Sequence, residues 1–181
     1  MAVDFNPQIQ FDQQHQQGDE LCWIAMAVSV KHHFNPPSQL KQCGLARTLL
    51  GISGPCCTAS GGVRKKCDQP GRLEDALGHP SVDHLAQPTT ASPNPMGGGA
   101  MTFGEVKAQI DNQLPVCVFI HWPGEEVGHF ILISGYLETG GKQYVYVNDP
   151  AFGSGPQPYN HVVSNYNSER GTWRFSYRLK A

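Results

Sequence analysis

The chain has 181 residues, of which 39% are hydrophobic and 15% are charged, and its formal net charge is −2. This composition suits one folded domain, residues 1–181, and the near-neutral charge provides neither a basic surface for nucleic acid nor an acidic disordered tail. No apolar run approaches the roughly 20 residues of a membrane span, and the N-terminus shows no secretory signal pattern. We therefore expect a soluble protein without a nucleic-acid or membrane partner.

The first hundred residues predict helices and loops. A polar arm, residues 1–19, precedes residues 21–34, where apolar side chains recur at helical spacing and predict a helix with one buried face, ended by two prolines. A second helix is expected from an N-cap at Ser38 to Gly51, and a short one around residues 72–77. Residues 79–100 contain four prolines and three consecutive glycines, which predicts an irregular connection between two lobes.

Residues 101–181 predict mainly strands. Thr102 and Glu105 match a capping box that would open a helix to about Gln113. β-Branched and aromatic residues then predict strands at 115–122, 128–137, 143–149 and 172–179. Helices first and strands afterwards predict an α+β fold, with a helical lobe (1–100) packed on an antiparallel sheet lobe (101–181) and a ligand cleft between them.

Six cysteines are many for a reduced cytosolic domain of this size. Four of them crowd into one loop-rich segment: Cys43, Cys56, Cys57 and Cys67. Disulfide bonds of unspecified pairing are the preferred interpretation, with free thiols and a zinc site as alternatives, and His79 and His84 are the nearest histidines. Cys117 lies inside an apolar strand, which favours a place in the core.

Cys22 stands apart, where the polar turn QQGDEL meets the first predicted helix. Taken alone, a cysteine there is more often a core residue, but a helix N-terminus also stabilises a thiolate. His129 begins an apolar strand, where it could serve such a nucleophile as a base, and the next strand ends in Asn148-Asp149. Asp149, or alternatively Asn148, would then orient the imidazole.

Two further residues near Cys22 complete the predicted site. Gln16, six residues earlier, is expected to hold an oxyanion together with the Cys22 backbone N–H, with Gln17 as a weaker candidate. Trp23 would shield the site from water and contact substrate. The walls of the cleft are expected from three loops, at residues 97–99, 123–128 and 151–158.

With these residues in place, the chain resembles the papain-like cysteine peptidases. The likeness is strongest to a bacterial branch that includes type III effector proteases of plant pathogens and peptidase domains that trim bacteriocin leader peptides. The matching segments span nearly the whole chain: residues 16–25, QCGLARTLLG, CDQPGRLEDAL, PVCVFIHW, GHFILISGY, YVYVNDPAFG and GTWRFSYRL. The resemblance implies a papain-like fold with Cys22 as nucleophile, His129 as general base and then acid, Asp149 as third member and Gln16 as oxyanion donor.

The resemblance implies a cysteine endopeptidase that acts on a protein or peptide through a thioester, without cofactor or metal. The same triad also serves deamidases and acyltransferases, and a non-catalytic binding module is a further alternative. We expect a bacterial effector or toxin that is secreted or delivered into a target cell and is cytoplasmic before export. A secretion machinery and an inhibitor or immunity protein are the further partners considered.

Overall fold

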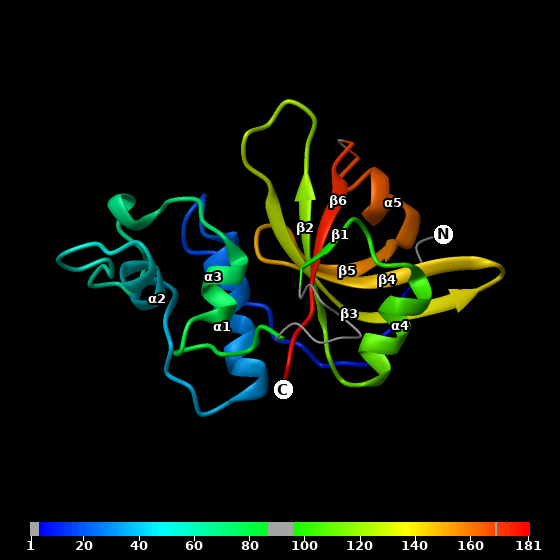
Figure 1. Cartoon of the computed structure of the whole chain (residues 1–181), viewed down its shortest axis with the longest axis horizontal. Coiled ribbons are helices and arrows are strands. Elements are labelled where there is room, and N and C mark those ends of the chain that lie inside the picture. The colour runs from blue at the N-terminus through cyan, green and yellow to red at the C-terminus, as the bar shows by residue number, and fades with distance from the viewer. Residues whose placement is uncertain (1–3, 87–95, 169) are drawn as a thin grey trace.

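The computed structural model describes residues 4–86, 96–168 and 170–181. Helices α1, α2 and α3 form one lobe, and an antiparallel sheet flanked by α4 and α5 forms the other (Figure 1). This arrangement confirms the α+β class that the order of helices and strands predicts. Within the described ranges, no helix is long and apolar enough to cross a membrane.

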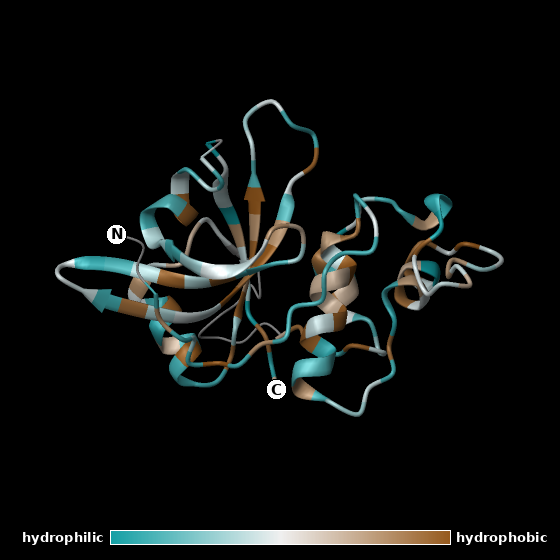
Figure 2. Cartoon of the chain, turned by 180° about the vertical axis from the view of Figure 1, so that it is seen from behind, coloured by the Kyte–Doolittle hydropathy of each residue, from teal (hydrophilic) through white to brown (hydrophobic). Residues whose placement is uncertain are grey.

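The helical lobe is built around α1, and its elements are α1 (Cys22–Phe34), α2 (Gln42–Leu49), the 3-10 turn η1 (Lys65–Cys67) and α3 (Leu73–Gly78). The prediction of one buried face on α1 is wrong, because residues 22–30 are all buried between β3 on one side and α2 and α3 on the other. Figure 2 shows this apolar middle and the polar C-terminal end. The predicted N-cap of α2 is also wrong, since the Ser38 hydroxyl accepts the Leu40 N–H in a turn ahead of the helix.

The sheet has six strands in the order β1-β6-β2-β3-β4-β5, and every neighbouring pair is antiparallel. The elements of this lobe are β1 (Met96–Gly98), α4 (Phe103–Asp111), β2 (Val116–His121), β3 (His129–Thr139), β4 (Lys142–Asp149), β5 (Gly153–Pro158), α5 (Tyr159–Ser164) and β6 (Thr172–Tyr177). The four predicted strands are confirmed within two residues at each end, and the capping box of α4 is present.

Three elements differ from the expectation. Residues 96–98 were expected to be irregular but form β1, which pairs with β6, while residues 87–95 of the same predicted connection lie outside the described part. The second and third are β5, whose residues GSGPQP pair with β4, and α5 after it, neither of which is predicted from the sequence. Main-chain pairing with a neighbouring strand forms β1 and β5, so neither needs side chains typical of strands.

Two apolar clusters lie on opposite faces of the sheet, and β3 contributes to both of them. Phe130 and Leu132 join the cluster around α1, whereas Ile131 and Ile133 join the cluster under α4 and α5. This alternation is the period of two that a strand buried on both faces requires. The first cluster therefore fixes α1 against β3, the two elements that begin with Cys22 and His129.

Two disulfide bonds, Cys43–Cys57 and Cys56–Cys67, organise the loop between α2 and α3. They confirm the disulfide interpretation and exclude the free-thiol and zinc alternatives for these four cysteines. The remaining cysteines, Cys22 and Cys117, are free and buried, and burial raises the pKa of Cys117, which is a core residue of β2.

Thiol titration tests this pairing. Under denaturing, non-reducing conditions we expect two reactive thiols, because Cys22 and Cys117 are free and the other four are bonded. A sample reduced before denaturation is the control and should show all six. Six reactive thiols without reductant would contradict both disulfides.

Candidate active site

Cys22 is the first residue of α1 and lies at the boundary of the two lobes. The N-cap residue, Leu21, has no side chain that caps the helix, so the N–H groups of the first turn are not taken by a capping group. The Cys22 side chain is only 7% exposed and lines a cavity of about 180 Å³ together with Trp23 and Gly71. A thiolate or an oxyanion at this point meets the positive end of the helix dipole.

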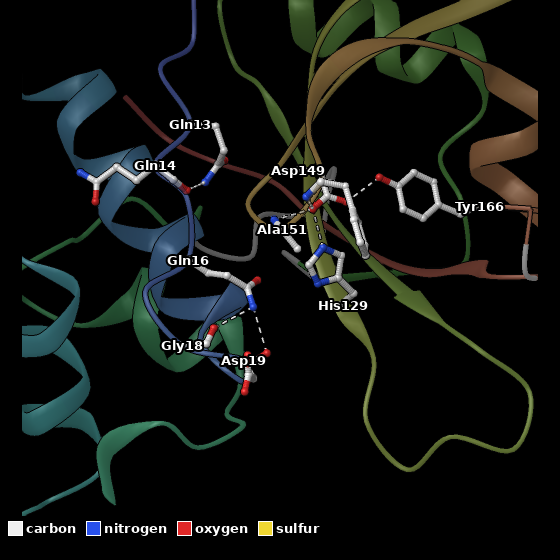
Figure 3. A network of polar contacts seen from close by, with 10 residues as sticks. Gln13, Gln14, Gln16, Gly18, Asp19, His129, Asp149, Ala151 and Tyr166 are labelled. Carbon is white, nitrogen blue, oxygen red and sulfur yellow. Dashed lines mark hydrogen bonds and ion pairs between the residues drawn. The ribbon is translucent and has the colours of Figure 1, made fainter. Parts of the chain in front are cut away.

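The register of β3 and β4 brings His129 next to Asp149. Leu132 pairs with Asn148, so Asp149 at the end of β4 lies diagonally across from His129 at the start of β3. His129 Nε2 donates to Asp149 Oδ1 at 2.8 Å (Figure 3). With Nε2 engaged by Asp149, Nδ1 is the ring nitrogen left for an interaction with Cys22, which is among the groups that raise the pKa of His129.

Asp149 is held by donors on several sides. Its Oδ1 also accepts the backbone N–H groups of Ala151 at 2.7 Å and Phe152 at 3.0 Å, and its Oδ2 accepts the Tyr166 hydroxyl at 2.6 Å. Burial raises the pKa of Asp149, but the hydrogen bonds from His129, Tyr166 and Ala151 outweigh burial and hold that pKa below its ordinary value. The carboxylate is therefore ionised at neutral pH.

Asn148, the alternative third member, points away from the imidazole. Its side-chain Nδ2 donates to the Ser134 hydroxyl at 2.7 Å in the interior. The structure thus brings Asp149, and not Asn148, to His129. Sequence reasoning missed Tyr166, which lies in a loop after α5 and belongs to no recognisable motif, so only the three-dimensional fold places it against Asp149.

The electrostatics of His129 favour the imidazolium. Burial alone would lower the pKa of His129, but hydrogen bonds and charge interactions with Asp149 and Cys22 raise it to about 9 from 6.5. The ring therefore carries a proton at neutral pH, next to the sulfur. That arrangement suits an ion pair of thiolate and imidazolium.

Gln16 lies across the cleft from His129. Its backbone N–H donates to the Pro150 carbonyl at 2.9 Å, which ties the N-terminal arm to the end of β4. Its side-chain Nε2 donates to the carbonyls of Gly18 at 2.8 Å and Asp19 at 2.9 Å, as Figure 3 shows. The side-chain Oε1 is buried without a protein partner.

Trp23 is buried beside Cys22, where its indole N–H donates to the Gln69 carbonyl at 3.0 Å. It lines the smaller cavity.

A second cavity of about 580 Å³ lies on the His129 side of the cleft. Its lining includes Gln16, Trp122 and Phe152, and it draws on two of the three predicted wall loops, residues 123–128 and 151–158. Residues 97 and 98 of the third loop instead pair with β6.

The fold, in which a buried helix beginning at Cys22 packs against an antiparallel sheet that carries His129 and Asp149, is that of the papain-like cysteine peptidases. The chain belongs to the Peptidase_C39 like family, whose sequence model matches residues 3–177. Among solved structures, digestive procathepsin L 3 of the Tenebrio molitor larval midgut is similar with a TM-score of 0.48 and 14% identity, over 96% of this chain and 67% of that chain. No curated protein sequence matches this chain.

The protonation of His129 is open to NMR titration. We expect the ring protons of the wild type to titrate with a midpoint near 9, because Asp149 and Cys22 stabilise the charged ring, which loses its proton only as the pH rises through that value. Replacing the carboxylate, in Asp149→Asn, should move the midpoint to lower pH by roughly one to three pH units.

Asp83→Asn is the matched control, because Asp83 pairs with Lys180 on the surface. It should leave the His129 midpoint unchanged. An unshifted midpoint in Asp149→Asn would mean that the carboxylate does not hold the proton on the ring.

Proposed function

We propose that this protein is a cysteine endopeptidase that hydrolyses peptide bonds through Cys22, His129 and Asp149. The observation that carries the proposal is the 2.8 Å hydrogen bond between His129 Nε2 and Asp149, with Cys22 among the groups that raise the pKa of the same ring. A nucleophile, a base and a group that orients the base are the parts that acyl transfer needs.

In the proposed reaction the Cys22 thiolate attacks the peptide carbonyl carbon, and the electrons of the C=O bond move to its oxygen. When the tetrahedral intermediate collapses, the C–N bond breaks and His129 gives its proton to the leaving amine. His129 then takes a proton from water, which attacks the thioester. The C–S bond breaks, the peptide acid is released, and the Cys22 thiolate and the protonated ring of His129 are restored.

The oxyanion is proposed to be held by the Cys22 backbone N–H and the Gln16 amide. The location of Cys22 at an uncapped helix start supports the first donor. Gln16 lines the same cavity as His129, which supports the second donor. Because the Gln16 amide contacts two loop carbonyls in the free enzyme, one of these contacts has to be exchanged for the oxyanion.

We propose a protein or peptide as substrate and an oxidising compartment as the place of action. The two disulfide bonds support such a compartment, because they form and persist under oxidising conditions. Secretion, or delivery into a target cell as an effector or toxin after a cytoplasmic stage, is the proposed route. An inhibitor or immunity protein that covers the cleft is the proposed regulatory partner.

The nucleophile is tested by Cys22→Ala. We expect hydrolysis of an unfolded protein substrate to fall at least about 10³-fold, because the other free cysteine, Cys117, is fully buried in β2. Mass spectrometry of the products should show fragments with the wild type and an intact substrate with the variant. Cys117→Ala, at the other free cysteine, is the matched control and should keep its activity.

Two outcomes would contradict the proposal. Continued cleavage by Cys22→Ala would remove Cys22 from the chemistry. An intact substrate in which the wild type has converted a side-chain amide to a carboxylate would indicate a deamidase.

The charge of the cleft predicts a preference for basic substrates. Glu20 and Glu126 line the cavity beside Cys22, Asp19 and Glu125 line the one beside His129, and none of the described residues lining either cavity is Lys or Arg. Peptides with Lys or Arg near the scissile bond should therefore show a higher kcat/KM than acidic ones at low salt, and the difference should shrink as salt screens the charges.

Glu126→Gln should reduce this preference, whereas Glu138→Gln, the same change at the exposed end of β3, should not. Equal kcat/KM for basic and acidic peptides at low salt would show that the cleft charges do not select substrates.

A further inference from the structure

A short segment after the second disulfide, residues 68–71, contacts the chain on both sides of Cys22. Upstream of Cys22, the Asp68 carboxylate accepts the backbone N–H groups of Asp19 at 3.0 Å and Glu20 at 2.9 Å. Downstream, the Trp23 indole N–H donates to the Gln69 carbonyl at 3.0 Å. The nucleophile is thus bracketed by contacts to one segment of the disulfide-bonded loop.

The Asp68 carboxylate and the Gln16 side-chain amide both form hydrogen bonds with the main chain of the turn at residues 18–20. Asp68 accepts the N–H groups of residues 19 and 20, while the Gln16 side chain donates to the carbonyls of residues 18 and 19. The orientation of these peptide groups therefore depends on both side chains. Since a hydrogen bond weakens steeply when its geometry is poor, a turn released from Asp68 no longer holds the Gln16 amide in place.

Close packing leaves little freedom in this arrangement. A Cβ atom at Gly18 would collide with the Asp68 carboxylate, and a Cβ atom at Gly71 would collide with the Trp23 ring. Both contacts require glycine, because a side chain at either position would overlap its neighbour. The segment at residues 68–71 therefore packs directly against the turn at Gly18 and against Trp23.

The disulfide loop anchors Asp68 itself. The residue before it, Cys67, is fully buried and bonded to Cys56, and the neighbouring Cys57 is bonded to Cys43 on α2. The Asp68 main chain is thereby fixed to the helical lobe, independently of the turn that its side chain holds.

We infer that Asp68 is a positioning residue that orients the oxyanion donors, the Gln16 amide and the Cys22 N–H, from the disulfide-bonded loop. This inference rests on the proposed function. Asp68 touches neither substrate nor sulfur in this account, and it acts through the turn at residues 18–20. Donors of this kind stabilise charge that develops only in the transition state, so their loss lowers kcat and leaves KM nearly unchanged.

The test uses Asp68→Asn, which keeps the size of the side chain but replaces one acceptor with an NH₂ group that faces a backbone N–H. We expect kcat for peptide hydrolysis to fall about 10- to 100-fold. A peptide aldehyde, whose tetrahedral adduct places an oxygen at the same donors, should bind more weakly by a similar factor. Alkylation of Cys22 by iodoacetamide should keep its rate, because that substitution develops no oxyanion.

Asp83→Asn is the matched control and should leave all three measurements unchanged, because Asp83 pairs with Lys180 away from the turn. An unchanged kcat in Asp68→Asn would overturn the inference. Equal losses in hydrolysis and in alkylation would also overturn it, because they would indicate general damage to the site.

Amide hydrogen exchange in the wild type tests the same contacts without a variant. The N–H groups of Asp19 and Glu20 should exchange at least about 10-fold more slowly than in an unstructured peptide, because Asp68 accepts both. Unprotected amides would overturn the inference even if the enzyme is a peptidase. Absence of hydrolysis by the wild type would instead refute the proposed function, and amide exchange and aldehyde binding would still decide the role of Asp68.

Discussion

A hydrogen bond of 2.8 Å joins His129 Nε2 to Asp149 Oδ1 and sets the orientation of the imidazole ring in the cleft. It requires β3 and β4 to pair in one register, since a slip of one residue would bring Asn148 to the position of Asp149 and turn the carboxylate to the other face. It also requires Asp149 to stay charged, which the Tyr166 hydroxyl and the Ala151 N–H support. With Nε2 committed to Asp149, the opposite ring nitrogen is left for Cys22.

The two sides of the site come from different lobes, and their relative position depends on packing. Cys22 is fixed because α1 is buried along its first nine residues, between the sheet and the other helices. His129 is fixed because the strand that follows it is buried on both faces. The disulfide-bonded loop contacts the turn that precedes Cys22 through Asp68, the residue after Cys67.

The sequence predicts the elements that carry a strong local signal. The Pro-free apolar run of α1, the capping box at Thr102 and the β-branched strands all appear close to their predicted bounds, because local patterning and burial act in the same direction there. The segment GSGPQP has no strand propensity and forms β5 only because β4 offers it an unpaired edge.

The alternation of Trp173, Phe175, Tyr177 and Leu179 with polar residues predicts a half-buried strand at 172–179, and this pattern is not kept at Phe175. A bulge in the pairing of β6 with β2 exposes Phe175 at 40% and buries Ser176.

At the candidate site, the order and spacing of residues along the chain identify Gln16, Cys22, His129 and Asp149 as candidates. Spacing along the chain does not identify Tyr166 or Asp68, because each contacts the site from a loop that the tertiary fold brings next to it.

In the proposed reaction, Cys22 forms a thioester with the acyl part of a peptide. Acid quenching during turnover of an activated peptide ester, followed by mass spectrometry of the digested protein, measures that intermediate directly. We expect an acyl group on the proteolytic fragment that contains Cys22, and none when Cys22 is replaced by Ala. Turnover without any acyl group on Cys22, or with the group on another residue, would contradict it.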